Sequence, residues 1–237
     1  MANKWHEIWE KRSANFADLD KMDDQAVFAE LKRINGFDIT AGGIPLQALL
    51  KQYEDTREKL NLSRGEALFE VGCGCGANLY MFHHDGIEVG GLDYSAKLIE
   101  IMQEVLPQDS LRECICGEAI NMPVDIQYDA VLSNSVFSYF PDFAYAGAVL
   151  EKMLHKARRC IALLDVHDME KKEAFIAYRV KNTEDYEERY KDLPKLFYPR
   201  NFFSDFAEQH GLKIEFLPSE VEGYWNNEFI FNVYMYK

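Results

Sequence analysis

The sequence predicts an α/β fold in which helices cover both faces of a mostly parallel sheet. A short apolar run at Ala67–Val71 is closed by glycines, and a second apolar run at Ile87–Leu92 ends in Asp93. Helical patterns separate these runs and the later ones. Buried parallel strands are near-continuous apolar runs joined by crossover helices. The length, 237 residues, suits one such domain.

The stretch A-L-F-E-V-G-C-G-C-G at residues 67–76 is the centre of this prediction. Its glycines permit positive φ and let a ligand approach the backbone closely. A helical pattern starts after Gly76, so the positive end of a helix dipole faces the same point. Asp93, at the tip of the second strand, is placed to accept hydrogen bonds from ribose hydroxyls. The stretch therefore predicts a loop that binds a nucleoside-containing ligand.

The spacing of the glycines separates two kinds of ligand. A dinucleotide loop reads G-x-G-x-x-G, whereas this loop reads G-x-G-x-G, from Gly72 to Gly76. Glu70 lies two residues before the first glycine, and a carboxylate there suits a cationic ligand better than a pyrophosphate.

The segments E-V-G-C-G-C-G and G-L-D-Y-S resemble motif I and the acidic ribose-binding position of class I S-adenosylmethionine-dependent methyltransferases. The resemblance covers nearly the whole chain. It implies a Rossmann-like, seven-stranded, mostly parallel sheet with an antiparallel last strand, helices on both faces and an N-terminal helical lid. The cofactor implied is S-adenosyl-L-methionine, with S-adenosyl-L-homocysteine as product.

The elements after the first two strands follow in order. Ser95 is placed to cap the next helix, and Gly211 to end the last one. The expected elements are helices at Leu46–Leu60, Ala96–Leu106, Pro141–His155 and Asn201–Gly211, and strands at Arg112–Cys116, Tyr128–Leu132, Arg159–Asp165, Lys213–Leu217 and Phe229–Tyr236.

Two segments lie outside this alternating pattern. Residues 1–64 are predicted as an N-terminal helical lid, with Trp5, Trp9 and Arg12 on one helical face. That face can equally be explained by packing on the domain. Residues 65–237 form the core, within which the charged, tyrosine-rich residues 166–199 are predicted as a helical substrate cap.

The resemblance also implies which residues bind the cofactor. Glu118 would contact the adenine amino group, with a solvated loop charge as the alternative, and the backbone around Ser133 and Asn134 would bind the methionine end. The full set is Glu70, Gly72, Cys73, Gly74, Gly76, Asp93, Tyr94, Ser95, Gly117, Glu118, Ala119, Ser133, Asn134 and Ser135.

The sequence gives weaker signals for the residues that bind the methyl acceptor. The resemblance implies that Phe137 and Tyr139 wall the methyl-transfer chamber. Together with His167, Tyr198 and Trp225 they are predicted to bind the substrate, and packing in the core is the alternative for Phe137, Tyr139 and Trp225. Methyl transfer depends mostly on positioning and desolvation, because the cofactor supplies the reactivity. An oxygen or nitrogen nucleophile also needs a base, and His167 is predicted in that role, with Tyr139 as a second catalytic candidate.

Composition narrows the class of partner. The formal net charge of −14 argues against a nucleic-acid substrate. No run approaches 18 apolar residues, so no membrane span is expected, and the N-terminus does not read as a signal peptide. Five cysteines, in C-x-C pairs and one single, predict reduced thiols, a cytoplasmic location and no metal site.

The sequence thus predicts a methyltransferase acting on an O or N atom of a small molecule. The segments K-W-H-E-I-W-E-K-R, L-S-N-S-V-F-S-Y-F and E-G-Y-W-N-N-E-F-I-F-N-V look like a bacterial small-molecule branch, some of it associated with cell-surface polysaccharide synthesis, so a sugar or glycan precursor is a candidate acceptor. An NAD-dependent oxidoreductase and a non-catalytic S-adenosylmethionine-binding protein are the alternatives. The acceptor, the methylated atom and the oligomeric state are left open.

Overall fold

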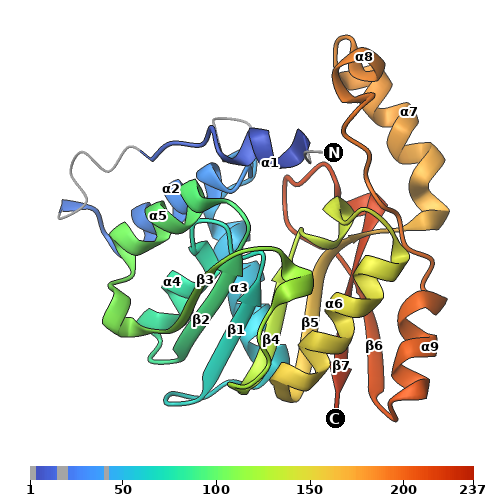
Figure 1. Ribbon diagram of the computed structural model, residues 1–237. Coiled ribbons are helices and arrows are strands. Elements are labelled where there is room, and N and C mark those ends of the chain that lie inside the picture. The colour runs from blue at the N-terminus through green and yellow to red at the C-terminus, as the bar shows by residue number, and fades with distance from the viewer. Residues whose placement is uncertain (1–3, 15–20, 40–42) are drawn as a thin grey trace.

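The computed structural model describes residues 4–14, 21–39 and 43–237 (Figure 1). Residues 1–3, 15–20 and 40–42 of the predicted lid lie outside the described residues.

One seven-stranded sheet forms the centre of the molecule. Its strand order is β3-β2-β1-β4-β5-β7-β6, and the sheet is parallel except that β7 runs antiparallel to both of its neighbours. The strands are β1 (Ala67–Val71), β2 (Glu88–Asp93), β3 (Leu111–Cys116), β4 (Tyr128–Asn134), β5 (Ala157–His167), β6 (Lys213–Pro218) and β7 (Ile230–Tyr236). The predicted fold class is confirmed.

Helices cover both faces of this sheet (Figure 1). Residues of α2 to α5 pack on one face, and residues of α6 and α9 pack on the other. The helices are α1 (Lys4–Trp9), α2 (Asp24–Ile34), α3 (Leu46–Leu60), α4 (Ala77–His84), α5 (Ala96–Val105), α6 (Phe143–Lys156), α7 (Lys172–Asn182), α8 (Tyr186–Tyr190) and α9 (Asn201–Gln209).

The first strand shows why two helix layers are needed. All five of its residues are buried, and Phe69 and Val71 pack on the α6 side while Leu68 packs on the α3 side. Side chains alternate between the two faces of a strand, so a strand whose residues are all buried requires cover on both faces. Helix α3 supplies part of that cover through Leu49 and Tyr53 and therefore belongs to the layer on the sheet.

Strand β5 runs two residues beyond its predicted end. Asp165 adopts positive φ (57°), and the pairing of β5 with β7 shifts register between Leu163 and Val166. The backbone N–H of Asp165 is satisfied by the side chain of Asn232, and the ladder resumes at Val166 and His167. A bulge of this kind re-aims the side chains that follow it.

Two segments stand above the carboxyl ends of the strands. Helix α1 lies over the end of the sheet, and α7 and α8 project away from it beside β5 and β7 (Figure 1). We call residues 172–190, which form α7 and α8, the arm. Its helical character was predicted, and it is joined to β5 through a short 3-10 turn at Met169–Lys171.

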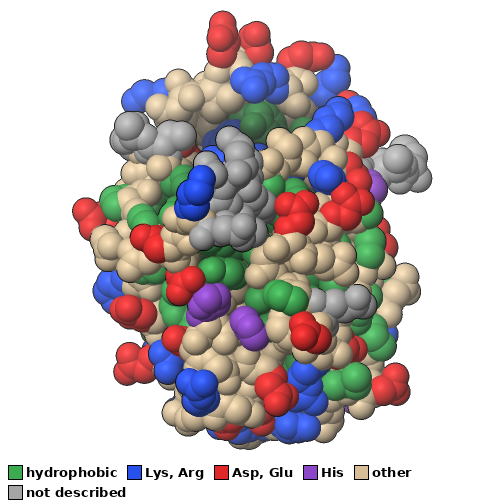
Figure 2. Space-filling model, turned by 90° about the vertical axis from the view of Figure 1, so that its left-hand side faces the viewer, with side chains coloured by type: hydrophobic (Ala, Val, Ile, Leu, Met, Phe, Trp, Pro, Cys, Tyr) green, Lys and Arg blue, Asp and Glu red, His purple; other side chains and the backbone are tan. Residues whose placement is uncertain are grey.

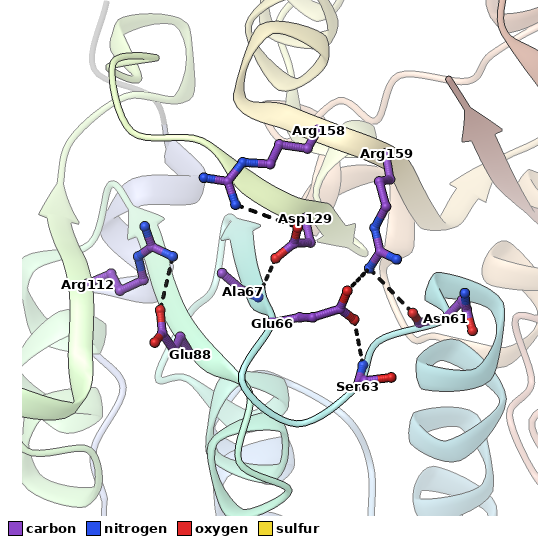
Figure 3. Close-up of polar contacts among 9 residues, drawn as sticks. All are labelled: Asn61, Ser63, Glu66, Ala67, Glu88, Arg112, Asp129, Arg158 and Arg159. Carbon is purple, nitrogen blue, oxygen red and sulfur yellow. Dashed lines mark hydrogen bonds and ion pairs between the residues drawn. The ribbon is translucent and has the colours of Figure 1, made fainter.

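Ion pairs lie at the other end of the sheet, where the parallel strands begin (Figure 3). Arg159 pairs with Glu66 at 3.0 Å, and Arg158 lies 3.6 Å from Asp129. Asp129 also accepts a 2.8 Å hydrogen bond from the backbone N–H of Ala67, which fixes the start of β1 against β4. These basic side chains are already occupied by carboxylates.

Asp129→Ala is expected to lower the free energy of unfolding by about 1–2 kcal/mol, because the N–H of Ala67 loses a charged acceptor. Urea denaturation followed by circular dichroism measures the change. Arg158→Ala is the control and should cost less than about 0.5 kcal/mol, since its side chain is 48% exposed. Equal losses in the two variants would show that the ion pair, and not the backbone hydrogen bond, carries the effect.

Candidate functional site

Two adjoining cavities lie at the carboxyl edge of the sheet. The first is lined by the ends of β1 to β4 and by α2, and the second by the ends of β4 and β5, the arm and the N-terminal segment. The second has a volume of about 810 Å³. Both cavities are lined by Trp9, Asn35, Phe37, Ser135 and Tyr139, which therefore mark their junction.

Asp93 holds the glycine loop in the first cavity. Its carboxylate accepts 2.9 Å hydrogen bonds from the backbone N–H groups of Gly74 and Ser95. Gly72 has φ 72°, and a Cβ there would lie 2.3 Å from Cγ2 of Val136, so only glycine fits. Asp93 is 5% exposed. Burial raises its pKa to about 6, against the lowering effect of the two backbone hydrogen bonds.

A buried polar network fills the wall between α2 and β1. The Lys32 ammonium donates to Oδ1 of Asn78 at 2.9 Å, and Nδ2 of Asn78 donates to Oε1 of Glu70 at 2.6 Å. Oε2 of Glu70 is buried and has no partner among the described residues. Burial raises the pKa of Glu70 and lowers that of Lys32, and each charge partly offsets the shift of the other.

The far end of the first cavity is apolar with one polar group. Glu118 accepts a 2.9 Å hydrogen bond from the hydroxyl of Tyr145 on α6, while Leu98 and Ala119 add apolar surface. Gly117 precedes Glu118, and its N–H is bound by the carbonyl of Asp93, which ties the ends of β2 and β3 together.

The structure brings most of the predicted cofactor-binding residues to this cavity. Those that line it are Glu70, Gly72, Cys73, Gly74, Asp93, Tyr94, Gly117, Glu118, Ala119, Asn134 and Ser135. Gly76, Ser95 and Ser133 lie behind its wall. Gly76 packs on Met102, Ser95 caps α5 through the N–H of Leu98, and the hydroxyl of Ser133 donates to a backbone carbonyl of β1.

The predicted substrate residues divide in the same way. Tyr139, His167 and Trp225 line the second cavity. Phe137 and Tyr198 do not; they are 2% and 0% exposed and pack with aromatic residues of α9. The hydroxyl of Tyr198 is bound to the carbonyl of Phe137, which closes this aromatic cluster from within. The rings of Phe137 and Tyr198 therefore pack in the hydrophobic core and do not line a cavity.

The predicted lid residues also reach the cavities. Trp5, Trp9 and Arg12 all line the second cavity, and Trp9 lines both. The rings of Trp5 and Trp9 meet the ring of Tyr139 edge-on at centroid distances of 4.8 and 5.8 Å. Indole Nε1 of Trp5 donates to the carbonyl of Pro194, so the start of the chain is joined to the segment after the arm.

A chain of polar side chains forms the floor of the second cavity. Ser135 donates to Asp165 at 2.5 Å, Tyr224 is hydrogen-bonded to Asp165, and Nδ2 of Asn226 lies 3.4 Å from the Tyr224 hydroxyl and 3.3 Å from Nε2 of His167. Ser135 and Asp165 both have positive φ, 59° and 57°. Such strain in non-glycine residues is concentrated at functional sites.

Several residues of the cavities were missed by the sequence reasoning. Lys32 and Asn78 are polar residues on otherwise buried helix faces, and the spacing of Lys32 from Phe28 on the apolar face of α2 was the available signal. Arg179 and Lys195 lie in charged segments where nothing in the sequence distinguishes them from solvated residues.

Comparison with known proteins agrees with this geometry. Residues 69–162 match the model of a family described as a methyltransferase domain. A curated relative, the malonyl-[acyl-carrier protein] O-methyltransferase of Priestia megaterium, is 29% identical over 76 residues. That match covers 31% of this chain and 27% of the relative's length.

Solved structures extend the likeness to nearly the whole chain. Magnesium protoporphyrin IX methyltransferase from Synechocystis PCC 6803, with bound S-adenosylhomocysteine, has a TM-score of 0.61 at 15% identity over 91% of this chain and all of the other. The plantazolicin methyltransferase, also with S-adenosylhomocysteine, has a TM-score of 0.60 at 15% identity over 98% and 93%. An amino pentose methyltransferase from Micromonospora echinaspora has a TM-score of 0.58 at 12% identity over 81% and 90%.

Residues 69–162 are thus similar to a methyltransferase domain, and the sheet topology and the glycine loop agree with that likeness. The cofactor of such methyltransferases is S-adenosyl-L-methionine, and two of the similar structures hold S-adenosyl-L-homocysteine.

The first cavity fits that cofactor. The orphaned Oε2 of Glu70 would accept from the α-ammonium group, and the buried Lys32 would pair with the α-carboxylate. Asp93 has lone pairs left for ribose hydroxyls, and Glu118 is placed for the adenine amino group. The part of the chain that the structure describes contains no group of three His, Cys, Asp or Glu side chains placed to bind a metal.

Lys32→Met is expected to weaken binding of S-adenosylhomocysteine at least about tenfold, because the cofactor carboxylate loses its buried cation. Isothermal titration calorimetry measures the affinity, and the free energy of unfolding without ligand is measured separately. Lys51→Met, on the exposed face of α3, is the control and should bind normally. Normal affinity in a folded Lys32→Met protein would contradict the assignment.

The affinity for S-adenosylhomocysteine is expected to fall about tenfold between pH 7 and pH 5. A carboxyl with a pKa of about 6 is mostly ionised at pH 7 and mostly protonated at pH 5. Ribose hydroxyls stabilise the ionised form, so binding requires it and releases a proton near pH 6. Calorimetry in buffers of different ionisation enthalpy measures this release. Asp93→Asn should bind weakly at both pH values, and an unchanged pH profile in that variant would exclude Asp93 as the titrating group.

Proposed function

We propose that this protein transfers the methyl group of S-adenosyl-L-methionine to an oxygen or nitrogen atom of a small molecule, with a sugar or glycan precursor as the first candidate. The observation that carries the proposal is the second cavity, which meets the first at Ser135 and Tyr139. Its volume of about 810 Å³ lies within the range of small-ligand sites.

The surroundings of the cavity favour a small acceptor over a macromolecule. Trp5 and Trp9 approach from the N-terminal segment, and Trp225 and the arm approach from the other side. We propose that α1 and α2, within the predicted lid of residues 1–64, act as the lid, and that the arm, within the predicted cap of residues 166–199, acts as the substrate cap. Acidic and basic side chains are interspersed among the described residues on the face that Figure 2 shows, an arrangement unlike the basic surface that a nucleic acid selects.

Aromatic rings beside amide groups suit a sugar. Trp225 offers exposed aromatic surface, with 37% of the residue accessible, and Tyr224 and Asn226 offer hydrogen-bonding groups next to it. One of the similar structures is named as an amino pentose methyltransferase, and another acts on magnesium protoporphyrin IX. Both names describe methyltransferases that act on small molecules, which agrees with the size of the second cavity.

The cofactor supplies an electrophilic methyl group on a sulfonium, and the protein must place a nucleophile in line with it. Tyr139 stands at the junction of the cavities and shapes that approach. Asp165 is 2% exposed, and its Oδ1 has no partner among the described residues, so it can accept the hydrogen bond of an acceptor hydroxyl or amine.

His167 remains a predicted catalytic residue, and burial lowers its pKa well below 6.5. The ring is therefore neutral at pH 7. In the proposal Asp165 is the nearer candidate to the junction, because it is bonded directly to Ser135, which lines both cavities.

A methyl-transfer assay tests the proposal. The purified protein is incubated with S-adenosylmethionine and a panel of nucleotide sugars and hydroxylated aromatic acids. Formation of S-adenosylhomocysteine, and of a product heavier by one methyl substitution, is expected with at least one acceptor. Asp165→Asn should lower kcat about 100-fold and leave S-adenosylhomocysteine binding within about threefold.

The same assay separates the alternatives. Binding of S-adenosylhomocysteine without turnover on any acceptor would favour a non-catalytic binding protein, and tight binding of NAD would favour an oxidoreductase. A cytoplasmic location stays a prediction from the sequence. Within the described residues, no helix is long and apolar enough to cross a membrane.

A further inference from the structure

The second cavity gathers positive charge on a protein whose net charge is −14. The basic residues that line it are Arg12, Lys172, Arg179, Lys191 and Lys195, and the acidic ones are Asp38, Asp165 and Glu187. Asp165 is already bonded to Ser135 and Tyr224, and Glu187 is exposed on the outer helix of the arm.

Arg179 is held by aromatic rings. Its guanidinium lies 5.0–5.2 Å from the ring centroids of Tyr186, Tyr190 and Trp225. No described carboxylate lies within 4.0 Å of it, and its Nε has no hydrogen-bond partner among the described residues. A guanidinium stacked in this way keeps the N–H groups at its edge available for a planar anion.

Lys195 lies closer to the junction of the cavities. Its ammonium is 4.0 Å from the ring centroid of Tyr139 and 5.3 Å from that of Trp5. It donates one hydrogen bond, of 3.3 Å, to the hydroxyl of Ser138, and no described carboxylate lies within 4.0 Å. The arginines at the opposite edge of the sheet, by contrast, are paired with carboxylates (Figure 3).

His167 adds a neutral donor to these two cations. Nδ2 of Asn226 reaches both the Tyr224 hydroxyl and Nε2 of His167. The Tyr224 hydroxyl donates to Asp165, so it accepts from Asn226, and Nε2 of His167 accepts the other amide proton. The ring proton therefore resides on Nδ1, which is buried and has no partner among the described residues.

The three groups face one space. All of them line the second cavity, and Lys195 and Arg179 are the two charged groups that act on the His167 ring. Phe175 and Phe197 flank that ring at centroid distances of 5.0 Å, so the donors are set in an apolar aromatic wall. Three donors with few acceptors, beside ring faces, describe a site for an anion attached to an apolar or ring-bearing body.

We infer that the methyl acceptor carries a carboxylate or phosphate group, which Arg179, Lys195 and the Nδ1–H of His167 bind in the second cavity. This inference rests on the proposed function and specifies the acceptor class for the same site. The reacting atom lies at the junction of the cavities, and the anion anchors the rest of the acceptor beneath the arm.

Binding of simple probes to the protein saturated with S-adenosylhomocysteine tests the inference. Benzoate and phenyl phosphate are the anionic probes, and benzamide and benzyl alcohol are their neutral counterparts. Calorimetry or ligand-observed NMR should show that at least one anion binds at least about tenfold more tightly than its counterpart. The preferred anion distinguishes a carboxylate acceptor from a phosphorylated one.

Variants that remove a positive charge test whether the anion binds in the second cavity. Arg179→Gln and Lys195→Gln should each weaken binding of the preferred anion about tenfold. Lys181→Gln removes the same charge from the same helix outside the cavities and should leave the affinity unchanged. Binding of S-adenosylhomocysteine should be normal in all three variants, which also shows that they are folded.

Three results would overturn the inference: equal binding of neutral and anionic probes, no binding of either anion at millimolar concentration, or equal effects of Arg179→Gln, Lys195→Gln and Lys181→Gln. Each would leave the proposed function standing as long as S-adenosylhomocysteine binds and methyl transfer occurs. Failure of the wild-type protein to bind S-adenosylhomocysteine would refute the proposed function itself.

Discussion

The buried contact between Lys32, Asn78 and Glu70 is the interaction on which the site depends. It joins α2 to α4 and to the end of β1, and it does so beneath the glycine loop. Charges buried in a protein interior are costly unless they are paired and hydrogen-bonded. The amide of Asn78 satisfies one atom of each partner, and Oε2 of Glu70 stays buried without a partner among the described residues. The network thus holds α2 in place, and the unpartnered oxygen would accept a hydrogen bond from a zwitterionic ligand.

The two edges of the sheet use charge in opposite ways. At the amino edge, Arg158, Arg159 and Arg112 are paired with carboxylates, and the pairs of Arg158 and Arg112 tie neighbouring strands together. At the carboxyl edge, Arg179 and Lys195 contact aromatic rings and no described carboxylate within ion-pair distance. Charges that are matched within the chain stabilise the fold, and charges that are not matched attract a ligand.

The strained residues lie where the two cavities meet. Ser135 and Asp165 adopt positive φ at the ends of adjacent strands and are bonded to each other. The bulge at Asp165 lets β5 continue to His167, so one strand delivers both side chains to the floor of the second cavity.

The sequence by itself determined the sheet, the glycine loop and the acidic end of β2, because apolar runs and glycines act locally along the chain. It also predicted the caps at Ser95 and Gly211. It did not separate Phe137 and Tyr198, which belong to the core, from Tyr139 and Trp225, which line a cavity. Nor did it single out Lys32, Arg179 and Lys195. Only the tertiary structure decided these, since whether an aromatic ring or a charge faces a cavity depends on segments that are distant in the chain and brought together by folding.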